Sequence, residues 1–403
     1  MSSSVHVLFH KPGNMQENHY LHVNWIDGMK INKSHFIAQD NAQVYQLAQN
    51  TSCLLNELNY GLLPLGQGGA GLKLFLSTDN QKKLQVRVQQ CRAISAGGYY
   101  VEFNEDTALH GNNLLTPTVS VPVSLRELKN KSTRFFIVLT INPYKRVPYG
   151  AAEGTELPPR VPYTLPLLSV DLVPAEQVTR NVLGPMQIPL GKIVVEDQRV
   201  MLEEDYIPPC TSLSSHPELL EIQAGLEQFY SKMELYSLQI MQKILQKKQT
   251  NDMAVIVQKI CENISYFTAS QLAELKAVGI IQPPVYMISK VSSLARIIKN
   301  TLDFYLGSGK EELVNYITEW GNMSQGELEG AIVNLSSQQY DHLDINNSIE
   351  NVSRFTKIIS RLFYQLSRLE YIGKRKEAGI FVKEEVVKAQ DGPVQKRRSF
   401  LAD

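Results

Sequence analysis

The alternation of hydrophobic and polar residues in the first half of the chain predicts β-strands. Short β-branched or aromatic runs, several with period two, occur at Leu72–Ser77, Leu84–Ile94, Tyr99–Phe103, Arg134–Ile141 and Gly191–Val195. A proline-rich passage from Pro143 to Pro166 cannot join a central strand, so it predicts a long loop or arm. The pattern favours a β-sandwich or barrel.

One helical pattern interrupts this strand-like half. Ser34 is suited to cap a helix, and apolar residues follow it at helical spacing: Ile37, Val44, Leu47, Leu54, Leu55 and Leu58. We expect a single helix crossing a β domain. Just upstream, Tyr20, Val23 and Trp25 are residue types typical of a strand.

The composition changes at Tyr206–Cys210, and the rest of the chain is helical in pattern. Ser215 or His216 can cap a helix whose first turn holds Pro217, where the missing N–H costs nothing. Seven residues then follow at alternating three- and four-residue steps, typical of a coiled-coil seam: Leu219, Ile222, Leu226, Phe229, Met233, Tyr236 and Ile240. They predict either the seam of a trimer or the inner face of a bundle.

Three more helices are predicted, around Met253–Phe267, after Pro284, and over a long final stretch that ends before Gly373. The final stretch has the most regular spacing, at Ile345, Ile349, Val352, Phe355, Ile359, Leu362, Leu366 and Leu369. The sequence therefore predicts an α+β protein: a β-sandwich-like domain (1–208), an α-helical bundle with coiled-coil character (209–373) and a short tail (374–403). One strand is expected within that tail, at Gly379–Val387.

Composition and charge narrow the functional classes. The chain has 403 residues, and its 40 basic and 40 acidic residues cancel, so no long-range field favours nucleic acid or an anionic membrane. The first residues do not resemble a secretory signal, and no run of eighteen apolar residues occurs. We therefore expect a cytoplasmic protein without direct membrane insertion.

Some glycines, cysteines and histidines could form a phosphate-binding loop or a metal site, but each has a simpler structural interpretation. Gly66–Gly71 (GQGGAG) precedes a predicted strand and lacks a Gly-Lys-Ser/Thr ending, so a turn is favoured over a phosphate loop. His19 and His22 would point to opposite faces of a strand, and His6 and His10 lie further upstream, so no metal pair is expected. The four cysteines, Cys53, Cys91, Cys210 and Cys261, lack zinc-site spacing.

His342 lies between Asp341 and Asp344 ahead of the last helix. This group suggests acid–base chemistry, but aspartates at this position normally cap a helix and complement its dipole, which is the favoured interpretation. Hydrolase and metalloprotease motifs are not found in the sequence. We expect neither an enzyme nor a bound cofactor.

The segment Trp25–Leu47 resembles the opening motif of the TssK family of type VI secretion baseplate proteins. Its matching residues are Trp25, Asp27, Gly28, Met29, His35, Phe36 and Asp40. Further matches follow in the family's order at Asn59–Leu65, Val170–Ala175, Ile188–Ile193, Asp205–Cys210 and Tyr340–His342. The resemblance covers about residues 20 to 372.

The resemblance implies a β-rich shoulder, a helical neck and assembly as a homotrimer. Members of the family connect a wedge, made with TssF and TssG, to a membrane-anchored complex, which implies a location peripheral to the inner membrane through partners. Typical members extend into a C-terminal head of domain size, whereas 30 residues follow Gly373 here. We therefore expect a different anchor, or another protein, at this end.

The resemblance also suggests where partners bind. Trp25, Met29 and Phe36 would supply apolar anchoring, while Asp27 and His35 hold the segment and Gly28 permits a turn. The alternative is that Trp25 and Phe36 belong to the core of the shoulder. An alternative for the whole protein is a phage-type trimeric tail or receptor-binding protein, which would share the trimeric shoulder.

Overall fold

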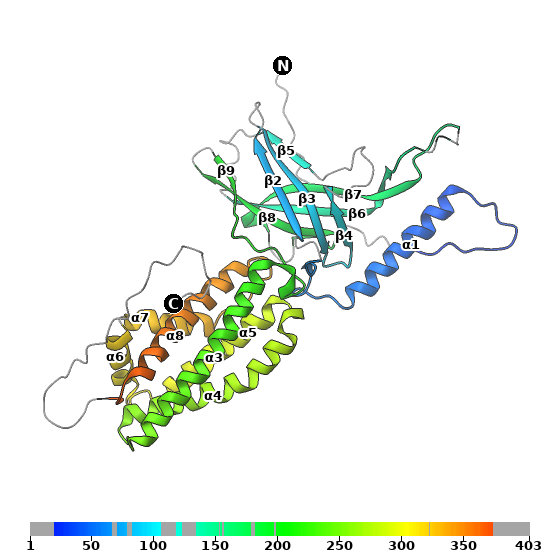
Figure 1. Ribbon diagram of the computed structural model, residues 1–403. Coiled ribbons are helices and arrows are strands. Elements are labelled where there is room, and N and C mark those ends of the chain that lie inside the picture. The colour runs from blue at the N-terminus through cyan, green and yellow to red at the C-terminus, as the bar shows by residue number, and fades with distance from the viewer. Residues whose placement is uncertain are drawn as a thin grey trace. The chain divides into compact units, whose positions relative to one another are not determined.

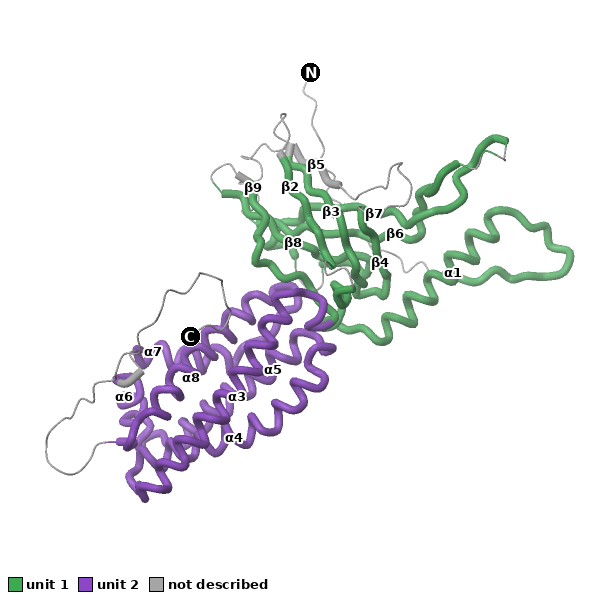
Figure 2. The backbone as a smooth tube through the Cα atoms, in the orientation of Figure 1, with its two compact units in different colours: residues 1–211 green, residues 212–403 purple. Residues whose placement is uncertain are grey.

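The computed structural model describes residues 20–66, 71–78, 83–105, 118–122, 134–152, 154, 157–178, 182–196, 199–321 and 323–373. The chain forms two compact units, residues 1–211 and 212–403 (Figure 2). All the described strands and helix α1 lie in the first unit, and helices α3 to α8 lie in the second (Figure 1). The α+β class is confirmed. The predicted tail, 374–403, and its strand lie outside the described residues.

The first sheet of unit 1 is organised around one long strand, β3 (Lys83–Ile94). It pairs antiparallel with β1 (Gly61–Leu62), β2 (Leu72–Thr78), β4 (Tyr100–Asn104) and β5 (Thr118–Pro122). Leu84, Val86 and Val88 alternate along β3 and are fully buried, because successive side chains of a strand point to opposite faces. These residues fix the face of β3 that builds the core.

The second sheet has the order β7-β6-β8-β9 and is also antiparallel. Its strands are β6 (Arg134–Tyr149), β7 (Tyr163–Pro174), β8 (Gln187–Glu196) and β9 (Arg199–Leu202), and the 3₁₀ turn η2 (Ala175–Gln177) follows β7. Phe136, Val138 and Tyr206 form a buried cluster beside this sheet. A Cβ on Gly191 would lie 2.7 Å from Leu74 Cδ1 of β2, so the two sheets approach closely there. Their packing as a sandwich stays a prediction.

Of the two forms predicted for the proline-rich passage, a long loop or an arm, the structure shows an extended two-stranded arm. β6 and β7 continue past the sheet as a two-stranded ribbon in which Arg146–Tyr149 pairs with Tyr163–Pro166 (Figure 1). Within β6, only Arg134–Thr140 pairs with β8. In the ribbon each strand has just one neighbour, so a proline can occupy a position whose N–H would face away from that neighbour.

Helix α1 (Lys33–Ser52) differs from its prediction at both ends. Asn32, not Ser34, is the N-cap, and its Oδ1 accepts a hydrogen bond from Ser34 N at 3.0 Å. The helix ends at Ser52, so Leu54, Leu55 and Leu58 lie beyond it. The segment from Tyr20 to Asn32 is called the strap below. It is not a strand: it has no regular secondary structure and runs beside α1.

The described part of unit 2 is a bundle of six α-helices. After the 3₁₀ turn η3 (Leu213–Ser215) come α3 (Pro217–Gln246), α4 (Asp252–Val278), the 3₁₀ turn η4 (Gly279–Ile281), α5 (Pro284–Phe304), α6 (Lys310–Gly321), α7 (Gln325–Ser336) and α8 (Ile345–Arg368). His216 is the N-cap of α3 and Pro217 is its first residue, as the sequence predicts. α3 packs against α4 and α8, and α5 packs against α4 and α7.

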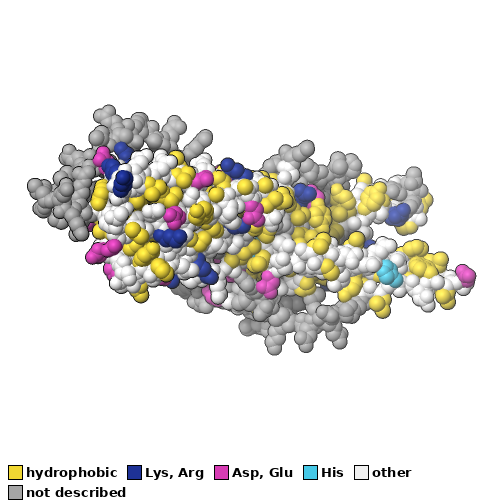
Figure 3. Space-filling model, turned by 90° about the horizontal axis from the view of Figure 1, so that it is seen from below, with side chains coloured by type: hydrophobic (Ala, Val, Ile, Leu, Met, Phe, Trp, Pro, Cys, Tyr) yellow, Lys and Arg dark blue, Asp and Glu magenta, His cyan; other side chains and the backbone are white. Residues whose placement is uncertain are grey.

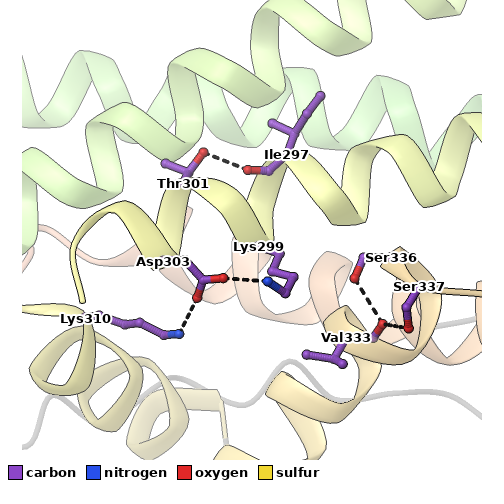
Figure 4. Close-up of polar contacts among 8 residues, drawn as sticks. All are labelled: Ile297, Lys299, Thr301, Asp303, Lys310, Val333, Ser336 and Ser337. Atoms are coloured by element: carbon purple, nitrogen blue, oxygen red, sulfur yellow. Dashed lines mark hydrogen bonds and ion pairs between the residues drawn. The ribbon is translucent and has the colours of Figure 1, made fainter.

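Helices α6 and α7 were not predicted, and polar contacts hold them to α5. Asp303 lies between Lys299 and Lys310, with each Nζ 2.6 Å from a carboxylate oxygen, so it connects the end of α5 to the start of α6 (Figure 4). The hydrogen bonds from Lys299 and Lys310 lower the pKa of Asp303. Arg296 donates to Ser336 O at 2.8 Å and so satisfies a carbonyl at the end of α7.

Candidate partner interface

The residues of the opening motif lie on an arm made of the strap and α1. The strap turns at Asp27 and Gly28, where Met29 N donates to Ile26 O at 3.3 Å and Gly28 has φ +77°. This conformation suits glycine because it has no Cβ. The turn places the Trp25 ring 6.0 Å from the His35 ring and 6.2 Å from the Phe36 ring. Three of the predicted residues therefore form one aromatic cluster.

His35 positions the start of the helix, and Asp27 does not share that role. Asn32 N donates to His35 Nδ1 at 3.3 Å, while the Asn32 side chain accepts from the backbone of the first turn, which completes a reciprocal cap. Asp27 is exposed at the tip of the turn. Met29 is half-buried.

The arm carries an unusual amount of exposed apolar surface. Trp25 is 46% exposed and Phe36 58%, so neither belongs to the core of the shoulder, which was the alternative left open by the sequence. Other exposed apolar residues on the strap, on α1 or just beyond it are Leu21, Ile26, Ile31, Ile37, Leu47 and Leu54. Patches of hydrophobic side chains are visible among polar ones at the right-hand end of the space-filling view (Figure 3). Large exposed apolar patches mark interaction sites.

Four tyrosines fix the base of the arm to the sheets. Tyr20 of the strap stacks on Tyr144 of β6 with ring centroids 4.0 Å apart, and it also lies 6.2 Å from Tyr45 of α1. The hydroxyls of Tyr99 and Tyr144 are hydrogen-bonded at 3.1 Å. Burial raises the pKa of both phenols, so they remain neutral donors and acceptors. These tyrosines are far apart in sequence, and no local pattern groups them.

Two further contacts fix α1 at its base. A Cβ on Gly98 would lie 2.3 Å from Ala48 O, so only glycine lets this turn approach α1 so closely. Arg146 of the ribbon donates to Asp40 Oδ2 at 2.9 Å and to Asn41 Oδ1 at 3.1 Å. The arm is thus held at its base while the aromatic cluster lies toward its other end.

The strap is also tied to α1 along its length. Gln39 Nε2 donates to His22 Nδ1 at 3.1 Å, and His22 Nε2 lies 3.2 Å from Gln46 Oε1. Val23 N donates to Gln39 Oε1 at 3.2 Å. His22 is therefore a structural residue of the arm, while His6, His10 and His19 lie outside the described residues.

The predicted seam of α3 is buried within this chain's own bundle. Leu219, Leu226 and Met233 are fully buried, and Ile222, Phe229 and Ile240 nearly so. Tyr236 is half-buried, with its ring 5.8 Å from that of Tyr364 on α8. The seam therefore contacts α4 and α8, and it is not available to a second or third copy.

The opposite face of α3 carries a second stripe with the same spacing. Its members are uncharged and follow one another at steps of four and three: Ala224, Gln228, Ser231, Leu235, Leu238, Gln242 and Leu245. Leu235, Leu238 and Leu245 are 51%, 42% and 64% exposed. We call this set the outer stripe. This stripe was not predicted from the sequence because it includes polar residues, so it does not form a continuous hydrophobic pattern.

The candidate catalytic residues have structural surroundings. His342 is 2% exposed, and its Nδ1 lies 2.7 Å from the Tyr340 hydroxyl. Asp341 Oδ1 accepts from Leu343 N at 3.0 Å, and Asp344 is the N-cap of α8 without a side-chain capping bond. Asp344 thus occupies the predicted cap position, but the predicted capping hydrogen bond from its side chain is not formed.

The remaining chemical candidates give no site either. Within the described ranges, groups of three or more metal-ligating side chains are not found. Burial raises the pKa of the Cys91 thiol to about 12 and also raises that of Cys210 and Cys261, which makes these thiols unreactive. Of the GQGGAG loop, residues 67–70 lie outside the described part. No described helix is long and apolar enough to cross a membrane.

Comparison with known proteins gives structural likeness alone, since no family profile and no curated protein matches. The chain is similar to a crystal structure of TssK, with 13% identity, a TM-score of 0.46 and coverage of 86% of this chain and 69% of that chain. It is also similar to TssK from the type VI secretion system of EAEC bound to nanobody nb18 (12%, 0.42, 81% and 98%). A TssK–TssF–TssG baseplate subcomplex matches as well (13%, 0.43, 86% and 99%). At these values the likeness does not establish a family.

Proposed function

We propose that this protein is a non-catalytic structural adaptor of a type VI secretion baseplate. In this proposal it is a homotrimer that binds TssF- and TssG-like wedge proteins and links them to a membrane-anchored complex. It would be cytoplasmic and peripheral to the inner membrane through these partners. The proposed β-sandwich-like shoulder is residues 1–208 and the proposed neck is residues 209–373.

The observation that carries the proposal is the arm. Trp25 and Phe36 are large aromatic residues that remain about half exposed, and aromatic residues of this kind dominate the binding energy of protein interfaces. They occur in the very segment that resembles the opening motif of the TssK family. The arm therefore supports binding of a wedge protein at the tip.

The fixed base makes the arm suitable for mechanical coupling. The stacking of Tyr20 on Tyr144 and the ion pair between Arg146 and Asp40 restrict its motion. A surface that is ordered before binding loses less conformational entropy when a partner docks. Movement of a wedge bound at the tip would then be passed to the sheets.

The outer stripe supports self-association of the neck. Stripes that repeat every three and four residues pack together when helices of different chains meet. Because the inner seam is buried within one chain, Leu235, Leu238 and Leu245 supply the uncovered apolar contacts. We assign the trimer contact to this face of α3.

The test is retention of co-expressed TssF- and TssG-like proteins from the same gene cluster. The variants Trp25→Ser and Phe36→Ser remove exposed rings without opening the core. Each loss should weaken retention by at least about thirtyfold, which corresponds to about 2 kcal/mol, the smaller interface hot spots. Phe75→Ser is the matched control, because Phe75 on β2 is 48% exposed in the same unit.

Two outcomes would contradict this assignment. If native protein retains no wedge proteins at any concentration, the baseplate role is wrong. If Phe75→Ser weakens retention as much as Trp25→Ser and Phe36→Ser do, general surface hydrophobicity is responsible and the arm is not the binding site.

A further inference from the structure

The chain leaves helix α8 through a segment that is unusually well fastened. α8 ends at Arg368, and residues 369–373 continue without regular helix or strand. Helix ends leave carbonyl groups without partners and normally fray. Here the segment lies against the last turn of α3 and the loop that leads to α4 (residues 243–251, together called the α3–α4 turn), about 120 residues earlier in the sequence.

Two side chains of the turn satisfy the carbonyl groups of this segment. Lys243 Nζ donates to Ser367 O and to Leu369 O, the latter at 3.3 Å, and so caps the end of α8 with a positive charge. Asn251 Nδ2 donates to Ile372 O at 3.0 Å. Its other side-chain atom, Oδ1, accepts from Ala254 N at 2.9 Å and caps α4.

The segment also donates a hydrogen bond to the turn, and an ion pair and a close backbone approach add to these contacts. Ile372 N donates to Gln249 Oε1 at 3.0 Å, and both residues are buried, at 3% and 8% exposure. Lys247 pairs with Glu370 at 3.3 Å. Gly373 has φ +96°, and a Cβ there would lie 3.0 Å from Asn251 Oδ1. Any other residue at position 373 would thus be strained and crowded.

We propose that residues 369–373 and the α3–α4 turn form an exit clamp, which fixes the position and direction in which the chain leaves the bundle. The clamp joins the end of α8 to the shared turn of α3 and α4. A partner attached beyond Gly373 would therefore act on α3 and α4 as directly as on α8. The clamp itself is independent of the proposed baseplate role, and only its use to transmit position between partners rests on that role.

The chain offers a variant that opens the clamp while leaving helix α4 capped. Asn251→Asp keeps the oxygen that caps α4 and removes the nitrogen that donates to Ile372 O. Lys243→Met removes the cap of α8 but keeps most of the side-chain volume. Lys232→Met is the control, because Lys232 is an exposed lysine on the same helix.

Hydrogen exchange on the full chain, without partners, measures the clamp directly. The amides of Leu369 and Ile372 should be protected in the native protein. The double variant Asn251→Asp/Lys243→Met should exchange at these amides at least tenfold faster, since each hydrogen bond lost shifts the opening equilibrium about fivefold. Trypsin cleavage after Arg368 should accelerate in parallel, while the amides of α5 remain unchanged.

Gly373→Ala is an independent perturbation from the other side of the contact, and it should produce the same local acceleration. Unchanged exchange at Leu369 and Ile372 in both the double variant and Gly373→Ala would overturn the clamp. Acceleration spread over α3, α4 and α5 would also overturn it, because it would indicate loss of the bundle. Since no partner is present, either result leaves the baseplate proposal to its own test.

Discussion

The two stripes of α3 make opposite predictions for substitution, and these can be measured together. Leu226 in the inner seam is fully buried, so Leu226→Ala should lower the free energy of unfolding by about 2–5 kcal/mol through lost contacts and a cavity. Leu235, Leu238 and Leu245 are roughly half exposed. Burying the rest of each in a trimer would contribute about 0.8–1.5 kcal/mol, hence about 2.4–4.5 kcal/mol per chain for the three residues.

The assay is light scattering after size-exclusion chromatography, with urea unfolding followed by circular dichroism. Three copies of the 45.4 kDa chain give a native mass of about 136 kDa. The triple variant Leu235→Ser/Leu238→Ser/Leu245→Ser should have the mass of one chain and keep its helical signal, because a loss of about 3 kcal/mol per chain weakens association more than a hundredfold.

Leu226→Ala should keep the native mass and unfold at lower urea. The assignment of the outer stripe would be refuted by a native mass of one chain. It would equally be refuted if Leu226→Ala dissociated the protein while the triple variant kept its native mass.

Two further predictions concern stability. Gly98→Ala should lower the free energy of unfolding by about 2–4 kcal/mol, because the new Cβ would meet a backbone carbonyl of α1 and φ at this position is +80°. Gly326→Ala in helix α7 is the comparison, because nothing lies within 4 Å of that position. It should raise the free energy of unfolding by about 0.5–1 kcal/mol. Both are measured by urea unfolding, and equal effects of the two would contradict the close approach at Gly98. Burial lowers the pKa of His216 to about 4 in the folded chain, so the unfolded chain binds more protons between about pH 4 and 6.5. Stability from this residue is thus present above pH 6.5 and falls by about 2–3 kcal/mol toward pH 4, and His216→Asn should flatten the curve measured by unfolding across this pH range.

The sequence predicted a helix well where buried apolar residues recur at regular steps of three and four. Residues from Ile345 to Leu366 repeat at three and four, and each predicted position within α8 is buried. Pro217 marked the start of α3 because proline fits the first turn of a helix. α6 and α7 were missed because each has only 12 residues, so its apolar pattern repeats over only about three turns.

The candidate interface was harder to predict, because exposure depends on distant contacts. Trp25 and Phe36 are as hydrophobic as core residues, and only the structure shows that no other described segment covers their rings fully. The strap was mistaken for a strand because Tyr20, Val23 and Trp25 are residue types common in strands. The cap at Asn32 was missed because histidine, rather than glutamate or glutamine, completes it at His35.

The prolines of the ribbon have a consequence for how the protein meets other chains. Pro148 is opposite Thr164, and Pro166 is opposite Arg146. Proline has no N–H, so these pairs are the ones that exchange no hydrogen bond, and the absent N–H of each would have pointed outward from the ribbon. Another chain that approached either edge would meet carbonyl groups and ring carbons where it needs donors. The prolines therefore remove one donor from each edge of the ribbon, which disfavours the addition of a further strand and favours partners that recognise its side chains.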